Sequence, residues 1–374
     1  MRILIDAVSA RAGGGVSYLV NLLQILPKIC PEDRFLVAMP EIRLPATIPE
    51  YANLEIRKIP EASSNPIRRY LWENTGLIDL CHSWKADLLF CVANIIPLRS
   101  PRIPVVVMIQ NVAPLTRKVL YLMKKTETWA SYCRMLYMQK LTLFAIRNSA
   151  RVMVLSQDSF NLLQQWQPAL KPEIAYHGIG SSFSPGQLRP PQAGSSPYFL
   201  FVSNFYIYKG LEHLINAISA NPDFPRVMVI GKAYDTGYMQ MIDKLIAENN
   251  CRDRLIFLDA VPYEELPGWY ANAAALISPS WCESSSITLL ESMACGCPVV
   301  AMRTGPMPEI CGPAAFYAEN CDAQSLATAM RAVLQTDREK ISQASIERAA
   351  VFTWEKSMQQ HARVFAEIAK PGEK

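Results

Sequence analysis

The stretch AALISPSWCESSSITLLESMACGCPVVA, residues 274–301, holds two short apolar runs with a longer helical pattern between them. The runs Ala274–Ile277 and Val299–Ala301 are typical of buried strands. We expect the helix to begin within Ser284–Ser286 and to end just before Gly296, because glycine is a common helix stop. A strand, a crossover helix and a second strand predict an α/β fold with parallel strands.

The same alternation fills the rest of the chain. Helical patterns such as Val16–Leu26 and Val119–Ile146 separate most of the strands, which favours parallel sheets with helices on both faces. In the first half, the expected strands are Arg2–Asp6, Phe35–Ala38, Leu54–Arg57, Leu88–Cys91, Val105–Ile109, Val152–Leu155 and Glu173–Tyr176. In the second half, they are Tyr198–Val202, Arg226–Ile230, Leu255–Leu258, Ala274–Ile277, Val299–Ala301 and Ala315–Tyr317.

A linker interrupts this alternation at Gly178–Pro197, which reads GIGSSFSPGQLRPPQAGSSP and has no periodicity. A length of 374 residues also fits two domains. We therefore expect residues 1–185 and 186–353 to form two doubly wound α/β domains. We expect residues 354–374 to form a last helix. The pattern does not decide whether this helix packs on the second domain or returns to the first. Ligands of such sheets bind beyond the carboxyl ends of the strands, so a cleft between facing domains is the expected active site.

The composition is that of a globular protein, with 50% hydrophobic and 19% charged residues. No uncharged apolar run reaches 18 residues, and Asp6 interrupts the first apolar run too early for a signal peptide. The ten cysteines show no zinc-site spacing, which predicts reduced thiols. These features predict a cytoplasmic protein.

Positive charge gathers in the first half. Residues 1–185 carry 21 lysines and arginines against 13 acids, whereas residues 186–374 carry 16 against 20. Much of the excess lies in residues 111–151, where aromatic residues are interleaved with the basic ones. This pattern predicts either peripheral contact with anionic lipids at the inner face of the cell membrane, or a solvated basic face over a buried aromatic stripe. No nucleic-acid-binding module is recognisable.

Two strand-to-helix turns carry residues suited to anion binding. Gly13, Gly14 and Gly15 follow the first strand, and allow either close approach of a ligand or merely a loop with positive φ. Lys209 follows the first strand of the second half and is suited to a phosphate, although a solvated loop lysine would look the same. Lys232 is a weaker candidate of the same kind.

The stretch at 283–291 adds two carboxylates. Ser284, Ser285 and Ser286 either cap the following helix or, with its free N–H groups, bind a phosphate. Glu291 lies in the second turn among apolar residues, where a carboxylate is costly unless it is hydrogen-bonded. Hydroxyl groups such as those of a ribose are suitable partners, and Glu283 could serve a second polyol. Together, these residues predict a site for a nucleotide sugar.

The motifs resemble those of the family 4 retaining glycosyltransferases, which have the GT-B fold. Glu283 and Glu291, followed by MACGCPVV, resemble the E-x7-E signature of that family. Further matches in the same order are GGGV at 13–16, YHGI at 176–179, KG at 209–210, VPYEEL at 261–266, GPMPE at 305–309 and FTWE at 352–355.

The resemblance implies transfer of a sugar from a nucleotide donor with retention at the anomeric carbon and without a metal or other cofactor. It implies that Glu291 holds the ribose, that Glu283 holds the donor sugar and that Lys209 holds the diphosphate, with Glu283 and Lys209 as the catalytic residues. Further substrate-binding residues implied are Gly14, Gly15, the backbone amides around Ser284, Ser285, Ser286, Ile287 and Thr288, and Val261 and Pro262 against the base.

The sequence departs from the family pattern at three places. Asn204 stands where an arginine is common, so a second cation is missing or comes from elsewhere. Gln110 and Asn111 replace a His-Asp pair and can form hydrogen bonds but carry no charge. The segment Glu283–Thr288 replaces the usual E-G-F-G-L-P, which changes the donor pocket.

The resulting hypothesis is a glycosyltransferase that builds a surface polysaccharide or glycolipid, with a glycan or lipid-linked acceptor bound by the first domain. Two alternatives stay open. One is a nucleotide-sugar-binding protein that keeps the fold but has impaired catalysis, which the residues at positions 110, 111 and 204 motivate. The other is a nucleotide-sugar epimerase on the same fold.

Overall fold

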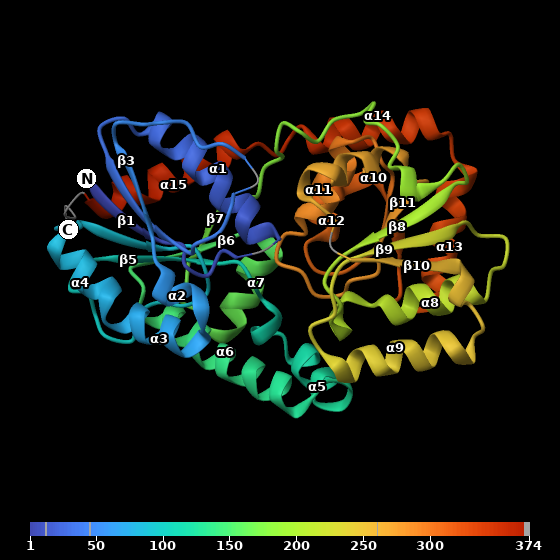
Figure 1. Ribbon diagram of the computed structural model, residues 1–374, viewed down its shortest axis with the longest axis horizontal. Helices are drawn as coiled ribbons and strands as arrows, with labels where there is room; N and C mark the ends of the chain where they lie inside the picture. Colours follow the sequence, from blue (N-terminus) through green and yellow to red (C-terminus); the bar gives the residue numbers. More distant parts are fainter. Residues whose placement is uncertain (12, 45, 260, 370–374) are drawn as a thin grey trace. The chain divides into compact units, whose positions relative to one another are not determined.

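The computed structural model describes residues 1–11, 13–44, 46–259 and 261–369, which form two compact units (Figure 1). Unit 1 consists of residues 1–111, residues 137–178 and the chain from Thr353 onward. Unit 2 consists of residues 112–136 and 179–352. Residues 370–374, part of the expected last segment, lie outside the described residues.

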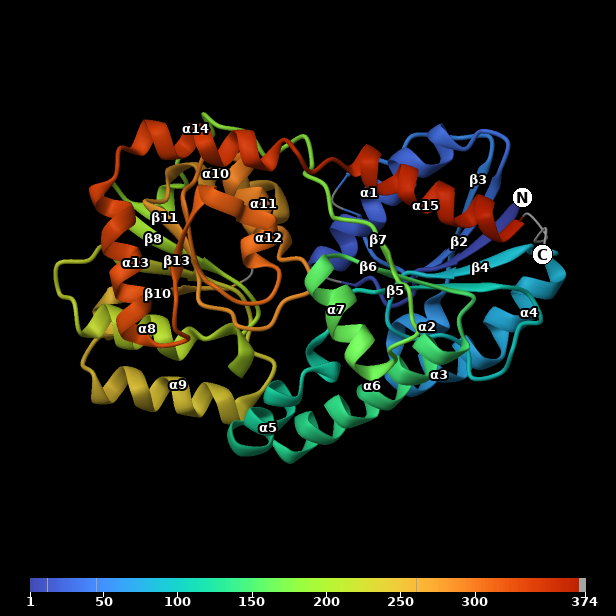
Figure 2. The same cartoon turned by 180° about the vertical axis from the view of Figure 1, so that it is seen from behind.

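Unit 1 is built on a seven-stranded sheet with the order β3-β2-β1-β4-β5-β6-β7, in which all neighbours are parallel. Helices α1 and α15 cover one face, and α2, α3 and α4 cover the other (Figures 1 and 2). The strands are β1 (Arg2–Asp6), β2 (Arg34–Met39), β3 (Leu54–Lys58), β4 (Leu88–Cys91), β5 (Val105–Ile109), β6 (Arg151–Val154) and β7 (Glu173–Ile174). The helices are α1 (Gly14–Ile29), α2 (Pro60–Ser64), α3 (Pro66–Asn74), α4 (Gly76–Ser83), α7 (Gln157–Trp166) and α15 (Trp354–Ala369), together with most of α6 (Trp129–Asn148).

Unit 2 is built on a six-stranded parallel sheet with the order β10-β9-β8-β11-β12-β13. Helices α8 and α13 pack together against it, and α10, α11 and α14 form a second packed group. The strands are β8 (Tyr198–Val202), β9 (Arg226–Ile230), β10 (Leu255–Leu258), β11 (Ala275–Ser278), β12 (Val299–Met302) and β13 (Ala315–Ala318). The helices are α5 (Arg117–Thr126), α8 (Leu211–Ser219), α9 (Thr236–Glu248), α10 (Leu266–Asn272), α11 (Ile287–Ala294), α12 (Met307–Cys311), α13 (Ala323–Gln335) and α14 (Arg338–Ala349).

The predicted doubly wound α/β architecture is confirmed, and each expected strand is present with its ends shifted by at most two residues. Strands at the centre of each sheet are buried on both faces, as in the run Val105–Ile109, so they read as continuous apolar segments. No helix in the described ranges has both the length and the apolar character needed to cross a bilayer.

The expected continuous helix Val119–Ile146 is wrong. The chain forms α5 and α6 instead, and Glu127 between them is extended, with φ −106° and ψ 167°. Thr128 donates its hydroxyl to Asp235 in a contact 107 residues along the chain, which overrides local helix propensity. The division into units also places residues 112–136 with unit 2, a placement that the sequence did not predict.

Helix α15 packs on α1 within unit 1 (Figure 2), a partner that the sequence pattern had left open. The buried Tyr18 of α1 and His361 of α15 are hydrogen-bonded at 2.6 Å. Gly178, the first residue of the linker and still part of unit 1, lies against the start of α15, where an added Cβ would come within 2.0 Å of the backbone nitrogen of Trp354. Any larger residue at 178 would therefore displace the helix.

Candidate functional site

Two loops meet at the centre of unit 2. The strand order reverses between β8 and β11, and such a switch point is where open α/β sheets bind ligands. The loop after β8 carries Lys209, and the loop after β11 carries Glu283. Both predicted residues therefore follow the two strands that flank the switch point.

The two loops are packed together tightly. Gly210 has φ 71°, and a Cβ there would lie 2.2 Å from the carbonyl oxygen of Pro279. The carbonyl oxygen of Tyr208 accepts hydrogen bonds from the backbone N–H of Trp281 and from the hydroxyl of Ser280, each at 3.1 Å. Glycine at 210 is thus required both for its backbone conformation and for the approach of the second loop.

Lys209 and Glu283 form an ion pair. Lys209 Nζ lies 2.7 Å from Glu283 Oε1, and the side chains are 18% and 14% exposed. The sequence predicted a phosphate as the partner of Lys209 and a sugar as the partner of Glu283. In the structure, the two side chains pair with each other. A ligand that took over one side chain would release the other, because each is held chiefly by opposite charge.

The side chain of Ser286 forms no capping hydrogen bond with helix α11, although side-chain capping was the simpler of the two roles predicted for the serines. Helix α11 begins at Ile287, so the expectation that it begins within the serines is wrong. Ser286 is the N-cap, but its side chain accepts no capping hydrogen bond, and its φ of 54° is left-handed. A non-glycine residue rarely adopts this conformation, and it prevents the helix from extending backwards.

Ser285 provides a buried hydroxyl at the start of α11. The residue is 1% exposed, and its Oγ has no hydrogen-bond partner among the described residues. A buried unpaired hydroxyl costs free energy, which a bound acceptor group would recover. This hydroxyl and the N-terminal end of α11 present donors suited to an anion. Ser284 precedes them and is half-buried, and Thr288 lies half-buried in the first turn.

Glu291 is fully enclosed at 2% exposure, and its partners come from the chain itself. The hydroxyl of Tyr263 donates to Oε1 at 2.7 Å, and that of Tyr270 donates to Oε2 at 3.2 Å. Burial raises the pKa of Glu291 to about 7, although the two tyrosine hydrogen bonds oppose this rise. The sequence predicted hydroxyl groups of a ligand as the partners of this carboxylate. In the structure both oxygens already accept from tyrosine hydroxyls of the chain, which the sequence did not identify, and the ribose role stays a prediction.

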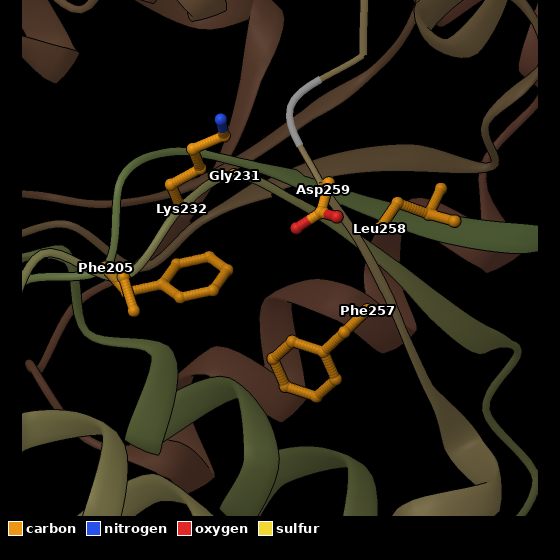
Figure 3. A pocket seen from close by; sticks show the side chains of 7 residues that line it. Phe205, Gly231, Lys232, Phe257, Leu258 and Asp259 are labelled. Carbon is orange, nitrogen blue, oxygen red and sulfur yellow. The ribbon is translucent and has the colours of Figure 1, made fainter. Parts of the chain in front are cut away.

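A pocket of about 500 Å³ lies at the carboxyl ends of β9 and β10 (Figure 3). The rings of Phe205 and Phe257 lie on one side, and Lys232 and Asp259 lie on the other. Lys232 was a weak sequence candidate, whereas Phe205, Phe257 and Asp259 were not predicted. An aromatic residue at or near the end of a strand is typical of the core, and a lone acid after a strand is typical of a loop. The exposed Asn204 and the half-buried Val261 are each within two residues of a lining residue.

The pocket floor requires glycine. Gly231 has φ 150°, and a Cβ there would lie 1.8 Å from the carbonyl oxygen of Ser203. The backbone N–H of Phe205 donates to the carbonyl oxygen of Lys232 at 2.9 Å, which continues the pairing of β8 and β9 beyond the strands. Pro262, the other residue expected against the base, is exposed and precedes a turn at Tyr263–Glu265.

In unit 1, the glycine-rich turn was predicted either to allow close approach of a ligand or only to provide positive φ, and the structure shows the positive φ. Gly13 is the N-cap of α1 with φ 57°, and a Cβ there would meet nothing within 4 Å. A Cβ on Gly15 would make only an ordinary contact with Ala10 at 3.7 Å. Positive φ therefore accounts for Gly13, while Gly14 and Gly15 are half-buried in the first turn of α1.

Gln110 and Asn111 belong to a polar network centred on Asn94, which is 4% exposed. Asn94 Oδ1 accepts from the backbone N–H groups of both residues at 3.0 Å. Gln110 Nε2 donates to the carbonyl oxygen of Val92 at 2.6 Å. Gln110 thus helps to hold the ends of β4 and β5 together, whereas the side chain of Asn111 is exposed. Asn94 was not among the site residues predicted from the sequence.

Solved structures with a similar fold match almost the whole chain. Sucrose-phosphate synthase from Thermosynechococcus elongatus has a TM-score of 0.78, with 98% of this chain and 99% of that chain covered at 18% identity. Alr3699/HepE from Anabaena, in complex with UDP-glucose, has a TM-score of 0.71, with 98% and 100% covered at 18% identity. At this identity the likeness establishes the fold, which is of the GT-B type, as expected.

Residues 189–350 match the family model described as Glycosyl transferases group 1. Over 162 residues, the chain is 28% identical to the O-antigen chain mannosyltransferase B of Escherichia coli. The matched segment covers 42% of each protein. The chain spans less than half the length of the curated relatives it matches. The second half of the chain, at residues 189–350, therefore matches the group 1 glycosyltransferase family, in agreement with the resemblance predicted from the sequence.

Proposed function

We propose that the protein is a retaining glycosyltransferase that moves a sugar from a nucleotide-sugar donor to a glycan or lipid-linked acceptor. The observation that carries the proposal is the pairing of Lys209 with Glu283 at the switch point of unit 2. Next to Glu283, the unpartnered hydroxyl of Ser285 and the first turn of α11 offer donors to an anion. A diphosphate bound there would take Lys209 and leave Glu283 to accept hydroxyl groups of the sugar.

The leaving nucleoside diphosphate gains negative charge as the glycosidic bond breaks. The ammonium of Lys209 and the positive end of α11 would stabilise that charge in a partly enclosed site, where such interactions are strongest. Glu291 would accept a ribose hydroxyl in addition to its hydrogen bonds from Tyr263 and Tyr270. The pocket at Phe205, Lys232 and Asp259, near Val261 and Pro262, has a volume suited to a nucleobase.

Retention and independence of metals are further parts of the proposal. We expect the anomeric configuration of the transferred sugar to be the same in product and donor, as judged by the anomeric proton signals in NMR spectra. We expect turnover to persist in excess EDTA, because Lys209 and backbone donors would provide the positive charge that a cation supplies in other enzymes. Loss of turnover in EDTA that returned with a divalent cation would contradict this expectation.

The acceptor is proposed to lie at a membrane, which fits a role in surface polysaccharide or glycolipid synthesis. Tyr121 is 58% exposed and Trp129 is 68% exposed, and Lys124 and Lys125 are exposed near them in the chain. Exposed aromatic and basic side chains together favour an anionic bilayer surface. Flotation should show binding to vesicles of phosphatidylglycerol but not of phosphatidylcholine, and less binding for the double variant Lys124→Gln, Lys125→Gln. Equal recovery with both vesicle types would contradict the membrane part alone.

A binding screen tests the donor. UDP-, GDP-, ADP- and dTDP-sugars are each titrated into the wild-type protein, followed by thermal unfolding and calorimetry. At least one is expected to bind and to raise the unfolding temperature. Binding without turnover in the presence of acceptor extracts would favour the catalytically impaired alternative, and conversion of the bound sugar into its epimer would favour the epimerase. If no nucleotide sugar binds, the proposal fails.

A further inference from the structure

The segment 112–136, called the α5 arm here, belongs to unit 2, although the chain on both sides of it belongs to unit 1. Within unit 2, α5 packs against α9 and against the short turn η3 (Ile207–Lys209). Val119 and Met123 of α5 are fully buried. The arm is therefore part of the packed structure of unit 2.

Asp235 anchors the end of α5. Asp235 is 2% exposed and caps α9 by accepting from the backbone N–H of Tyr238 at 3.0 Å. It also accepts the hydroxyl of Thr128 at 2.7 Å and the backbone N–H of Thr128 at 3.1 Å. Burial alone would raise the pKa of Asp235, but hydrogen bonds from Ser131, Thr128 and Tyr238 outweigh it and lower the pKa. The carboxylate is thus a fixed, charged attachment point for the arm.

The arm also contacts the turn that carries Lys209. Glu127 Oε1 accepts from the backbone N–H of Ile207, which lies two residues before Lys209, at 3.4 Å. The side chain of Arg134 is hydrogen-bonded to that of Tyr206. These contacts fix the backbone from which the Lys209 side chain projects.

A second set of contacts reaches the loop that carries Glu283. Lys118 Nζ lies 4.7 Å from the centre of the Trp281 ring, within the range of a cation–π interaction. Cys282 Sγ donates to Thr116 Oγ1 at 3.5 Å. Trp281 and Cys282 directly precede Glu283, so the arm contacts both loops of the ion pair within three residues of the charged groups.

We propose that the α5 arm is a positioning element that holds the Lys209 turn and the Glu283 loop at the spacing at which the two side chains pair. An element that touches both loops restrains the distance between them, in addition to the direct contacts of the loops at Tyr208 and Gly210. This inference deepens the proposed function and rests on it, because it concerns the same pair. Thr128, Asp235 and Lys118 are then positioning residues that need not touch the donor.

The test compares two identical substitutions, Asp235→Ser and Asp243→Ser. Serine is a good N-cap, so α9 stays capped at position 235 while Thr128 loses its carboxylate partner. Asp243 lies on the same helix, is 62% exposed and pairs with Arg252 at 3.5 Å, so its replacement is the matched control. Amide hydrogen exchange of the ligand-free full chain is followed in segments 203–210 and 280–286. We expect amide hydrogens in both segments to exchange about tenfold faster in Asp235→Ser than in the wild type. In Asp243→Ser, we expect their exchange rates to be unchanged.

Titrations with UDP and with GDP complete the test. Each nucleotide that binds the wild type should bind Asp235→Ser about tenfold more weakly, as expected for the loss of one charge-assisted anchor. Unchanged exchange in both loop segments overturns the proposal, as does faster exchange confined to the arm. If Asp235→Ser does not fold, Lys118→Met replaces it, with faster exchange expected in segment 280–286 and unchanged exchange counting against the arm.

The two proposals fail in different ways. A wild-type protein that binds neither nucleotide contradicts the nucleotide part of the proposed function, while faster exchange of the two loops in Asp235→Ser still supports the positioning role. A wild-type protein that binds a nucleotide, with both loops unaffected by the substitution, contradicts the positioning role alone.

Discussion

Glu283 and Glu291 stand eight residues apart but lie in opposite surroundings. Glu283, on the loop before α11, touches solvent and pairs with Lys209 at 2.7 Å. Glu291, inside α11, is enclosed, and its two hydrogen-bond partners are tyrosine hydroxyls. Glu283 is held by the charge of Lys209, which a bound anion can attract to itself. Glu291 is held by neutral hydroxyl groups, to which a ligand can only add further hydrogen bonds. The first is suited to exchange partners during a reaction, and the second to recognise hydroxyl groups without changing its surroundings.

The largest expected effect concerns the stability that depends on Glu291. Glu291→Ala leaves a cavity and removes the acceptor of Tyr263 and Tyr270, so we expect the free energy of unfolding to fall by about 3 kcal/mol. Glu291→Gln keeps a similar volume and an acceptor oxygen, and should lose much less. Urea unfolding measures both. Equal stability of Glu291→Ala and wild type would show that the tyrosine contacts contribute little. Glu291→Gln is the better probe of the ribose role, because its donor affinity is not confounded by unfolding.

The enclosed carboxylate should also show itself in the pH dependence of stability. The pKa of Glu291 is raised to about 7 in the folded protein from an ordinary 4.5, so the folded state keeps a proton that the unfolded chain releases. Its contribution therefore declines as pH rises from about 4.5 to 7, by about 3 kcal/mol at most. Unfolding of the wild type at pH 5 and pH 8, compared with Glu291→Gln, should show a steeper decline in the wild type. Parallel curves would place the pKa of Glu291 near its ordinary value.

Removal of the exchangeable partner should affect binding more than folding. Lys209→Met keeps the length of the side chain but leaves Glu283 without its cation, and it removes the proposed phosphate contact. We expect nucleoside diphosphate affinity to fall about 100-fold, as for the loss of one member of a partly buried charge pair. Lys209→Arg retains the charge and serves as the control in calorimetric titrations. If Lys209→Met binds like the wild type, the diphosphate does not lie at this pair.

Ser285 should give the smallest effect and the most specific one. Ser285→Ala removes a buried hydroxyl that lacks a partner in the free protein, so stability should stay the same or rise by up to about 1 kcal/mol. If the hydroxyl donates to the diphosphate, affinity should fall about fivefold in the same variant. Thermal unfolding and titration of one sample measure both. A fall in stability with unchanged affinity would assign Ser285 to the protein core instead.

The sequence predicted the sheets well because strands of a parallel sheet are buried on both faces and read as short apolar runs, as β5 does at Val105–Ile109. It failed where a distant contact or an unusual backbone conformation decides the local structure. The break between α5 and α6 depends on Thr128 meeting Asp235, and the start of α11 depends on the left-handed Ser286. Neither contact nor conformation leaves a periodic signal.

The sequence predicted which residues belong to the candidate site, but not which side chains they contact. Lys209 and Glu283 were identified because each follows a strand at the expected end of the sheet, and Glu291 because it is a carboxylate in an apolar helical run. Their pairing was not, because it depends on the order of strands in space: β8 and β11 are neighbours in the sheet but are separated by β9 and β10 in the chain. The hydrogen bond from Tyr263 to Glu291 was not predicted either, because the two residues are 28 positions apart in the chain.

The central claim is that the Lys209–Glu283 pair belongs to a donor site for sugar transfer. Its most direct test is the release of nucleoside diphosphate from a panel of nucleotide sugars by wild-type protein supplied with membrane and glycan acceptor extracts. The account predicts acceptor-dependent release from at least one nucleotide sugar, and loss of that release in Glu283→Gln. Release at the wild-type rate in Glu283→Gln, or no release from any donor by the wild type, would contradict it.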